Sequence, residues 1–334
     1  MMNMTATKTE AAGSAAAESP RLPETDTRLV YGFLDAGKTT YLKENVMNDV
    51  FWKYGSTLIL CFEEGEEAFD PEALAKKKTS VEYYNGGNVT AFCLACLEKH
   101  RPDRVYIEMN AMMGDLRDAL PACLKKTFAV TLIDWETMSV YYANFMQMMK
   151  QMVADSQQVV FRGCPSRELL SPYSQVFRLM NPKASYLRRD PMGYHEKAFE
   201  MFLPYSLEEP EITISENRFL PFWLDALDHP EHYDGKRLLF TDPVELRESG
   251  PGGPRAVGRV VMTCCLQDLQ FMSFETANTE PASRFGESWL TGSALAGVVT
   301  GAYGVRKLRL LFQTVQAAAP PKELILDGRR APED

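Results

Sequence analysis

Residues 32–40 read Gly-Phe-Leu-Asp-Ala-Gly-Lys-Thr-Thr, and a short apolar run precedes them. The spacing matches the pattern G-x-x-x-x-G-K-[ST], which belongs between a strand and a helix. Gly32 and Gly37 allow a sharp turn that points backbone amides and the start of a helix into one cavity. Lys38 then reaches phosphate oxygens, and the Thr39 hydroxyl is a ligand for Mg²⁺. The segment therefore predicts a loop that binds the phosphates of a nucleotide.

Composition bounds the class of protein. The chain has 334 residues, 45% hydrophobic and 24% charged, which is enough for a sizeable core and two domains. A formal net charge of -9 with no basic stripe argues against a nucleic-acid partner. The sequence has neither an apolar run of membrane-spanning length nor the apolar core of a signal peptide, so we expect a cytoplasmic protein. Seven irregularly spaced cysteines indicate reduced thiols.

Four segments follow from the local patterns. Residues 1–27 are small and polar, which predicts a disordered tail. Residues 28–190 alternate strands and helices, which predicts an α/β domain with a doubly wound, mostly parallel sheet. Residues 191–232 are punctuated by proline and are expected to form a helical connector. Residues 233–334 contain short β-like runs separated by Gly and Pro, which predicts a small β-barrel.

The loop also resembles a known family. The segment GFLDAGKTTYLKE is similar to the GFLGAGKTTLL loop of CobW-type GTPases, P-loop proteins associated with metal delivery and cofactor metallation. Asp35 stands where that family usually has glycine, and the resemblance extends over residues 28–187. It implies GTP or ATP with Mg²⁺ as cofactors. The implied nucleotide site includes Gly32, Asp35, Ala36, Gly37, Lys38, Thr39 and Thr40.

Two acidic positions complete the implied site. Glu63 begins a segment close to the family's NEFGE, and the resemblance implies that Glu63 or Glu66 lies near the nucleotide's Mg²⁺, together with Thr39. Without the resemblance, a solvated acidic loop is the better account of this segment. Glu108 ends an apolar strand as a Walker B residue does, where the family's IETTG becomes residues 107–111 here. The implied catalytic pair is Lys38 and Glu108.

Two family motifs are degraded. The metal-binding NGCICC becomes residues 85–90, where Gly87, Val89 and Thr90 occupy the cysteine positions, so the usual metal site is absent. The guanine-reading N-K-x-D is replaced by a segment that contains Arg162. Its planar guanidinium suits stacking on a base. Without the acidic guanine reader, GTP and ATP both remain open.

Residues from 233 onward resemble the soluble C-terminal domain of YcgQ-like proteins, membrane partners of a predicted permease. The shared core contains T-C-C-x-x-D, here Thr263 to Asp268. The resemblance implies an OB-like barrel and a permease or membrane partner. Cys264 and Cys265, with Asp268 nearby, are candidate ligands for a soft cation such as Zn²⁺. Two alternating strand residues, one buried and one exposed, explain the pair equally well.

These features predict a nucleotide-binding protein that drives metal handling as a metallochaperone accessory of a permease. The alternative is a degenerate regulatory or scaffold subunit without hydrolysis, and a third candidate is a kinase-like enzyme that uses ATP. The sequence contains no recognisable water-positioning glutamine or arginine finger, so GTPase-like hydrolysis stays open. His229 and His232 have the spacing of one helix face, and ordinary surface positions are the simpler account of them.

Overall fold

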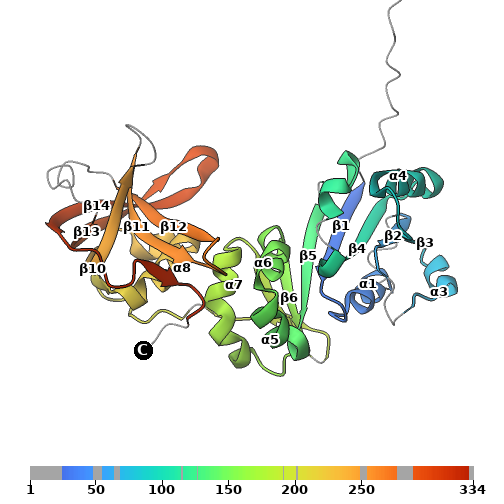
Figure 1. The fold of residues 1–334 in the computed structure, drawn as a ribbon, viewed down its shortest axis with the longest axis horizontal. Coiled ribbons are helices and arrows are strands. Elements are labelled where there is room, and N and C mark those ends of the chain that lie inside the picture. The colour runs from blue at the N-terminus through green and yellow to red at the C-terminus, as the bar shows by residue number, and fades with distance from the viewer. Residues whose placement is uncertain are drawn as a thin grey trace, which may run out of the picture.

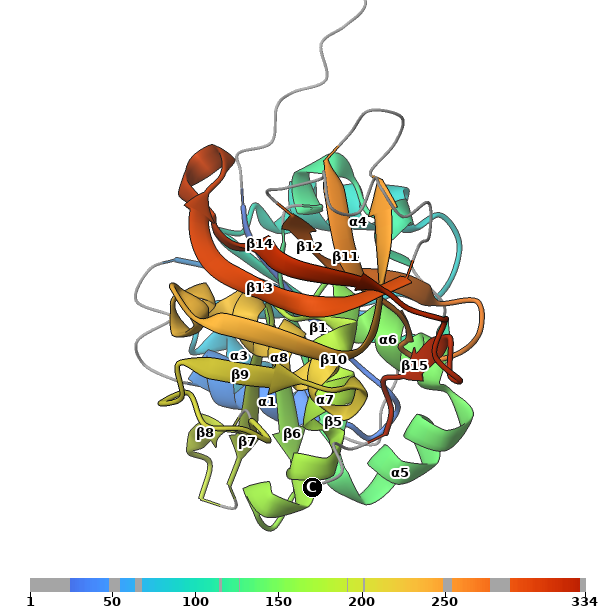
Figure 2. The same ribbon diagram turned by 90° about the vertical axis from the view of Figure 1, so that its left-hand side faces the viewer.

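The chain forms two sheets, each with its own helices (Figures 1 and 2). They are seen in a computed structural model. It describes residues 25–47, 55–63, 68–113, 116–125, 127–190, 192–200, 202–248, 254–276 and 289–330. The predicted tail, residues 1–27, lies mostly outside the described residues, and Asp26 and Thr27 already belong to the first strand.

The first sheet has eight strands in the order β3-β2-β4-β1-β5-β6-β7-β8. All neighbours are parallel except β7 and β8. Every residue of β2 is buried, as expected for an apolar strand covered on both faces. The strands are β1 (Asp26–Gly32), β2 (Thr57–Cys61), β3 (Thr79–Tyr83), β4 (Arg104–Asn110), β5 (Thr127–Asp134), β6 (Gln158–Arg162), β7 (Ser185–Arg189) and β8 (His195–Lys197).

Helices cover both faces of this sheet, and a separate buried apolar cluster forms on each face. The doubly wound, mostly parallel fold of a P-loop domain is therefore confirmed. None of the helices in the described part of the chain is long and apolar enough to cross a lipid bilayer. The helices are α1 (Lys38–Met47), α3 (Pro71–Ala75), α4 (Val89–His100), α5 (Trp135–Asn144), α6 (Met146–Ala154) and α7 (Ser174–Met180), with short 3₁₀ turns η1 (Ala111–Met113), η2 (Leu116–Ala119), η3 (Ala122–Leu124) and η4 (Arg167–Tyr173).

The methionine-rich segment differs from its predicted form. The sequence predicts one long helix over residues 140–153, whereas the structure has α5 and α6 with a break at Phe145. Phe145 has φ -131° and ψ 33°, outside the helical region. Its ring packs against Phe33 and Tyr141, so a tertiary aromatic contact accompanies the break.

The second sheet closes into a five-stranded barrel. Its order is β15-β11-β12-β14-β13-β10-β9, and an additional pairing of β10 with β11 completes the ring. The closed Greek-key barrel confirms the predicted OB-like module. Along β14 buried and exposed residues alternate, as in a barrel wall. The elements are β9 (Glu211–Ile214), α8 (Glu216–Asp228), η5 (Pro230–Tyr233), β10 (Arg237–Glu248), β11 (Arg255–Met262), β12 (Leu269–Thr276), β13 (Trp289–Thr300), η6 (Ala302–Gly304), β14 (Arg306–Ala317) and β15 (Ile325–Asp327).

The segment 191–232, expected to be a helical connector, contains strands as well as α8 and η5. β8 extends the first sheet through its pairing with β7, and β9 joins the second sheet through β10. Short strands at a sheet edge carry little apolar periodicity, which is why the sequence did not indicate them.

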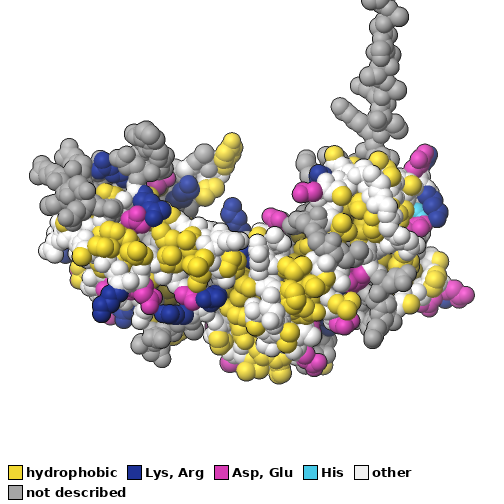
Figure 3. Space-filling model, viewed as in Figure 1, with side chains coloured by type: hydrophobic (Ala, Val, Ile, Leu, Met, Phe, Trp, Pro, Cys, Tyr) yellow, Lys and Arg dark blue, Asp and Glu magenta, His cyan; other side chains and the backbone are white. Residues whose placement is uncertain are grey.

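α7 holds the two sheets together. Leu179 of α7 belongs to the buried apolar cluster of the barrel. Nε2 of Gln175 donates to the carbonyl oxygens of Gly328 and Arg330, at 3.0 and 2.7 Å. Arg178 forms an ion pair with Asp228 at the end of α8. In Figure 3, hydrophobic side chains gather over the helices beside this junction and over the barrel.

Candidate nucleotide-binding site

The carboxyl ends of the central strands meet at one edge of the first sheet. β1 lies between β4 and β5, so the strand order reverses direction at β1. In open α/β sheets, such a switch point is where ligands bind. Gly32 ends β1, Glu63 follows β2, Glu108 lies in β4 and Arg162 ends β6. The residues predicted for the nucleotide and Mg²⁺ therefore come together at this edge.

The bend between β1 and α1 needs special backbone angles. Asp35 and Gly37 have φ values of 60° and 76°, in the left-handed region. Aspartate is one of the few non-glycine residues that visit this region as single residues, which explains how the loop accepts Asp35. The positive φ at Gly37 favours glycine, and a Cβ there would lie 1.1 Å from Nη1 of Arg162, so a larger residue would displace the guanidinium.

Lys38 is buried, and its ammonium group has two polar contacts. Its Nζ donates to the carbonyl oxygen of Phe33 at 2.7 Å and lies 2.6 Å from Oε1 of Glu63. The side chain of Lys38 is 1% exposed and that of Glu63 is 10% exposed. The ammonium group of Lys38 thus lies over the loop, where phosphate oxygens are expected. The carboxylate of Glu63 neutralises its charge.

Thr39 and Glu108 form the second polar contact of the site. Oγ1 of Thr39 donates to Oε1 of Glu108 at 2.7 Å, and the thiol of Cys61 donates to Oε2 at 3.4 Å. Register explains the second contact, because Cys61 and Glu108 are direct neighbours on β2 and β4. Burial raises the pKa of Glu108, although Thr39 and Cys61 oppose the shift. Burial also raises the pKa of Cys61, and the neighbouring charge of Glu108 is the second cause of this shift.

The oxygen groups fit a hard divalent cation. Within the described residues, Oε2 of Glu63 is buried without a hydrogen-bond partner. The Thr39 hydroxyl and the Glu108 carboxylate belong to the same site, and Glu63 is close enough to Glu108 to raise its pKa. Mg²⁺ prefers such oxygen ligands and usually keeps several waters. The donor set therefore suits Mg²⁺.

Arg162 lies on the loop itself. Its Nη1 donates to the carbonyl oxygen of Ala36 at 3.2 Å, and the guanidinium covers Gly37. Its strand neighbour Asp134 accepts a hydrogen bond from the backbone of Thr137 and caps α5. Arg162 thus contacts the loop from the carboxyl end of β6.

Phe33 anchors the loop to α5. Its ring stacks on Tyr141 of α5, with centroids 3.9 Å apart and planes 1° from parallel. Phe33 is buried in the cluster that α5 and α6 share. Because Phe33 also supplies the carbonyl that holds Lys38, the stack helps to fix the position of the ammonium group.

The predicted soft-metal residues lie away from this edge, in the turn between β11 and β12. The Sγ atoms of Cys264 and Cys265 are 3.8 Å apart, and Sγ of Cys264 is 3.5 Å from Asp268. Lys150 of α6 forms an ion pair with the same Asp268. Burial raises the pKa of Cys264 to about 12, which favours the thiol over the thiolate that a metal needs. Zinc binding here remains a prediction.

Two features of the site were not anticipated from the sequence. The first is the pairing of Glu63 with Lys38, because an acidic run after a strand also suits a solvated loop. The second is the stack of Phe33 on Tyr141, because Phe33 stands at an unrestricted position of the loop motif. Only the apolar character of residue 33 could have indicated a buried contact.

Several solved structures are similar to part of the chain. Hydrogenase maturation factor HypB from Archaeoglobus fulgidus is 13% identical, with a TM-score of 0.36 over 50% of this chain and 82% of its own. The Zn(II)-bound YjiA GTPase from E. coli is 15% identical, with a TM-score of 0.34 over 50% of this chain. The match spans 56% of the YjiA chain. HypB from Helicobacter pylori in complex with nickel is 12% identical, with a TM-score of 0.31 over 48% of this chain and 78% of its own.

No family model matches the sequence, and no curated protein matches it. The proposed function therefore depends on the geometry of the site.

Proposed function

We propose that the bend between β1 and α1 binds the phosphates of a nucleoside triphosphate together with Mg²⁺. The observation that carries this proposal is the position of Lys38 and Thr39, which follow each other on the first turn of α1. Oγ1 of Thr39 lies 2.7 Å from Oε1 of the buried Glu108. An ammonium group, a hydroxyl and a strand carboxylate on one bend are the groups that a phosphate chain with Mg²⁺ requires.

Binding exchanges the partner of Lys38. Nζ leaves Oε1 of Glu63 and donates to phosphate oxygens, while its hydrogen bond to Phe33 keeps the side chain over the loop. The N–H groups of the first turn of α1 add the positive end of the helix. The released Glu63 carboxylate would then be available to hold Mg²⁺, so the same residue neutralises Lys38 before binding and would serve as a metal ligand afterwards.

Thr39 and Glu63 would hold Mg²⁺, and Glu108 orients the Thr39 hydroxyl. The ion, when bound, neutralises charge on the β- and γ-phosphates. Lys38 and Glu108 are the proposed catalytic residues of a slow, partner-stimulated NTPase. The remaining proposed nucleotide contacts are Gly32, Asp35, Ala36, Gly37 and Thr40.

The base site is proposed at Arg162. Its guanidinium must leave the carbonyl of Ala36 to stack on a base. A planar cation stacks on guanine and on adenine alike, so GTP and ATP are both proposed ligands.

We further propose that the nucleotide state reaches the barrel through α5 and α6. Phe33 stacks on Tyr141, Phe145 leads into α6, and Lys150 of α6 pairs with Asp268 beside Cys264. This continuity supports coupling between the nucleotide site and the barrel, and the metal-handling role with a permease partner is proposed from the resemblance alone. The zinc content of purified wild type, compared with that of Cys264→Ser/Cys265→Ser, tests whether the two cysteines bind the metal. Equal zinc content in the two proteins would exclude the cysteines as its ligands.

A second function is favoured by the Lys38–Glu63 pair. Because Glu63 already satisfies the buried ammonium group, the loop keeps its shape without a ligand. A regulatory or scaffold subunit that has lost nucleotide binding would keep this arrangement.

Titration with labelled GTP and ATP, with and without Mg²⁺, separates the two functions. Lys38→Ala removes charged hydrogen bonds and is expected to weaken binding roughly 10- to 100-fold. The exposed Lys76 supplies the matched control Lys76→Ala, which should bind as wild type does. Absence of binding by wild type for both nucleotides, unchanged in Lys38→Ala, supports the scaffold.

A further inference from the structure

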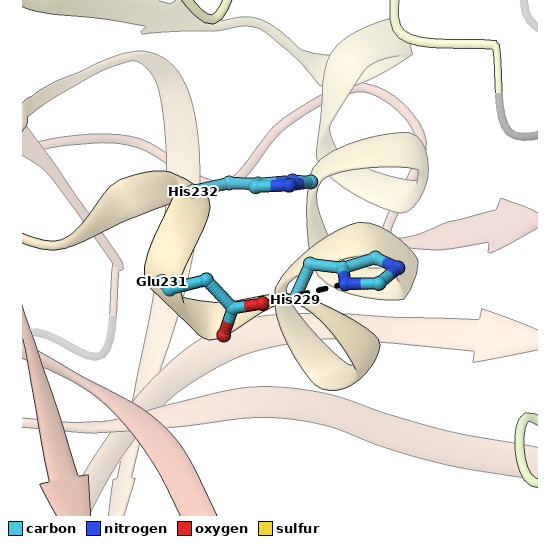
Figure 4. A group of neighbouring side chains, drawn as sticks. All are labelled: His229, Glu231 and His232. Carbon is cyan, nitrogen blue, oxygen red and sulfur yellow. Dashed lines mark ion pairs between the residues drawn. The ribbon is translucent and has the colours of Figure 1, made fainter.

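A cluster of two histidines and a glutamate lies at the start of the barrel domain, away from the nucleotide site. His229 follows α8, and Glu231 and His232 belong to η5. One ligand atom from each of the three side chains lies within 4.8 Å of the other two. Figure 4 shows the His232 ring above the His229 ring, with the Glu231 carboxylate turned toward His229. Imidazole nitrogens with a carboxylate oxygen are a common ligand set for Zn²⁺.

The local fold explains why these side chains converge. α8 ends at His229, whose φ of -130° and ψ of 58° are not helical. Pro230 then begins η5, and the backbone N–H of His232 donates to the carbonyl oxygen of His229 at 3.0 Å. This tight turn stacks the two imidazole rings, with centroids 4.8 Å apart and planes 23° from parallel.

A buried carboxylate orients one of the rings. Oδ2 of Asp225 lies 2.9 Å from Nδ1 of His232 and accepts a hydrogen bond from the hydroxyl of Tyr233, also at 2.9 Å. Asp225 is almost completely buried, and Tyr205 in turn contacts the Tyr233 hydroxyl. Metal-bound histidines usually donate their other N–H to a carboxylate in this way. The contact at Nδ1 leaves Nε2 of His232 to face an ion.

The other two side chains are reachable from solvent. The side chains of His229 and Glu231 are 55% and 45% exposed, and Nδ1 of His229 lies 3.4 Å from Oε1 of Glu231. Nη1 of Arg306 lies 3.4 Å from the other oxygen of this carboxylate, Oε2. A tetrahedral zinc site needs ligand atoms roughly 3.4 Å apart, with nitrogen lone pairs that converge on the ion, so the exposed His229 ring must turn out of the stack to bind it.

The cluster also borders a cavity between the two domains. The cavity has a volume of about 290 Å³. Its lining on the barrel side includes His229, Asp225 and Asp228, and its lining on the side of the first sheet includes Tyr186 of β7 and Lys197 of β8. Through His229, an ion held by the three side chains would lie at the border of this cavity, where water or a small ligand fits.

We propose that His229, Glu231 and His232 bind a divalent transition-metal ion of the zinc type, and that Asp225 positions His232 for it. The site is independent of the nucleotide loop and of Cys264 and Cys265. The competing account is an exposed ion-pair cluster that ends α8 and takes no metal.

Cobalt titration of the full-length protein tests the proposal. We expect wild type to bind one equivalent of Co²⁺ at this site with a visible d–d absorption band, and Zn²⁺ to displace it. The double variant His229→Ala/His232→Ala should lose that band and weaken binding at least tenfold. His195→Ala is the matched control, because His195 is an exposed histidine of β8 outside the cluster. Circular dichroism checks that each variant is folded.

A second variant keeps the outcome unambiguous. Cys264→Ser/Cys265→Ser should leave the cobalt band and the affinity unchanged, and the wild-type spectrum should lack a thiolate-to-cobalt charge-transfer band. The proposal is overturned if wild type binds no more Co²⁺ or Zn²⁺ than the histidine double variant. It is equally overturned if the cysteine variant, and not the histidine variant, loses the ion.

Discussion

Oε1 of Glu63 lies 2.6 Å from Nζ of Lys38, and the two side chains are nine-tenths buried or more. The ammonium group that a phosphate chain would need is therefore neutralised by a carboxylate from the segment that follows β2. Because a buried charge pair is costly to break by removing one partner, this contact sets the free energy that nucleotide binding must overcome. It also connects the phosphate site to the proposed Mg²⁺ site.

Glu63→Gln separates these two roles. The neutral amide no longer competes for Lys38, so nucleotide affinity measured in EDTA should rise about tenfold, the equivalent of about 1.4 kcal/mol. The same change removes a proposed Mg²⁺ ligand, so adding Mg²⁺ should improve binding less than in wild type. Glu98→Gln, at an exposed position of α4, is the control. Equal affinity of Glu63→Gln and wild type in EDTA would show that the pair does not compete with phosphate.

Glu108→Gln should stabilise the ligand-free protein at neutral pH. Burial raises the pKa of Glu108, so the folded protein binds this proton more tightly than the unfolded chain. The stability that the proton contributes is fully present below the unfolded pKa and is lost as the pH rises through the folded pKa. A neutral amide does not ionise, so the variant does not lose this stability as the pH rises.

The measurement is the free energy of unfolding in urea, for both proteins, at neutral pH and near the ordinary glutamate pKa of about 4.3. The advantage of the variant should shrink toward the lower pH. A variant that is less stable than wild type at neutral pH would contradict the assignment of a destabilised buried carboxylate.

Tyr141→Ala should loosen the phosphate-binding loop. The loss of the stack on Phe33 is expected to cost roughly 1–3 kcal/mol of unfolding free energy and to weaken nucleotide binding, since Phe33 holds Lys38. Tyr194→Ala, at a tyrosine that is 71% exposed, should change neither quantity. Urea unfolding and nucleotide titration check the pair. Identical behaviour of the two variants would mean that the stack does not position the loop.

Gln175→Ala should open the junction between the domains. The substitution leaves two carbonyl oxygens, those of Gly328 and Arg330, without their donor, at an expected cost of about 1–3 kcal/mol. Amide hydrogen exchange in β15, which ends next to Gly328, should accelerate relative to the rest of the barrel. Gln151→Ala, at an exposed position of α6, is the control. Unchanged exchange in β15 would contradict the role of Gln175.

Most of the architecture could be predicted because it depends on local patterns. Strand, glycine loop and helix follow each other at residues 28–44, and the apolar run of β2 already indicates a strand covered on both faces. The change to short β-like runs after residue 233 likewise predicted the barrel. Such patterns arise from propensity and periodicity, which a sequence displays directly.

Long-range contacts could not be predicted in the same way. The break at Phe145 accompanies contacts with Phe33 of the loop and Tyr141 of α5, and the partner of Lys38 depends on where Glu63, after β2, lies relative to α1. The histidine pair lies at the surface, as the sequence suggests, but nothing in its spacing indicates the buried Asp225 behind His232. Tertiary packing, rather than any local pattern, decides which residues form these contacts.

The central claim is that the bend between β1 and α1 binds a polyphosphate, and a ladder of ligands tests it most directly. The affinities of the nucleoside and of its mono-, di- and triphosphate are measured in Mg²⁺ with wild type and Lys38→Ala. We predict that affinity rises with each added phosphate up to the triphosphate, by at least about 100-fold between mono- and triphosphate, and that Lys38→Ala removes most of this increase. Equal affinity along the ladder, or a ladder that Lys38→Ala leaves intact, would contradict it.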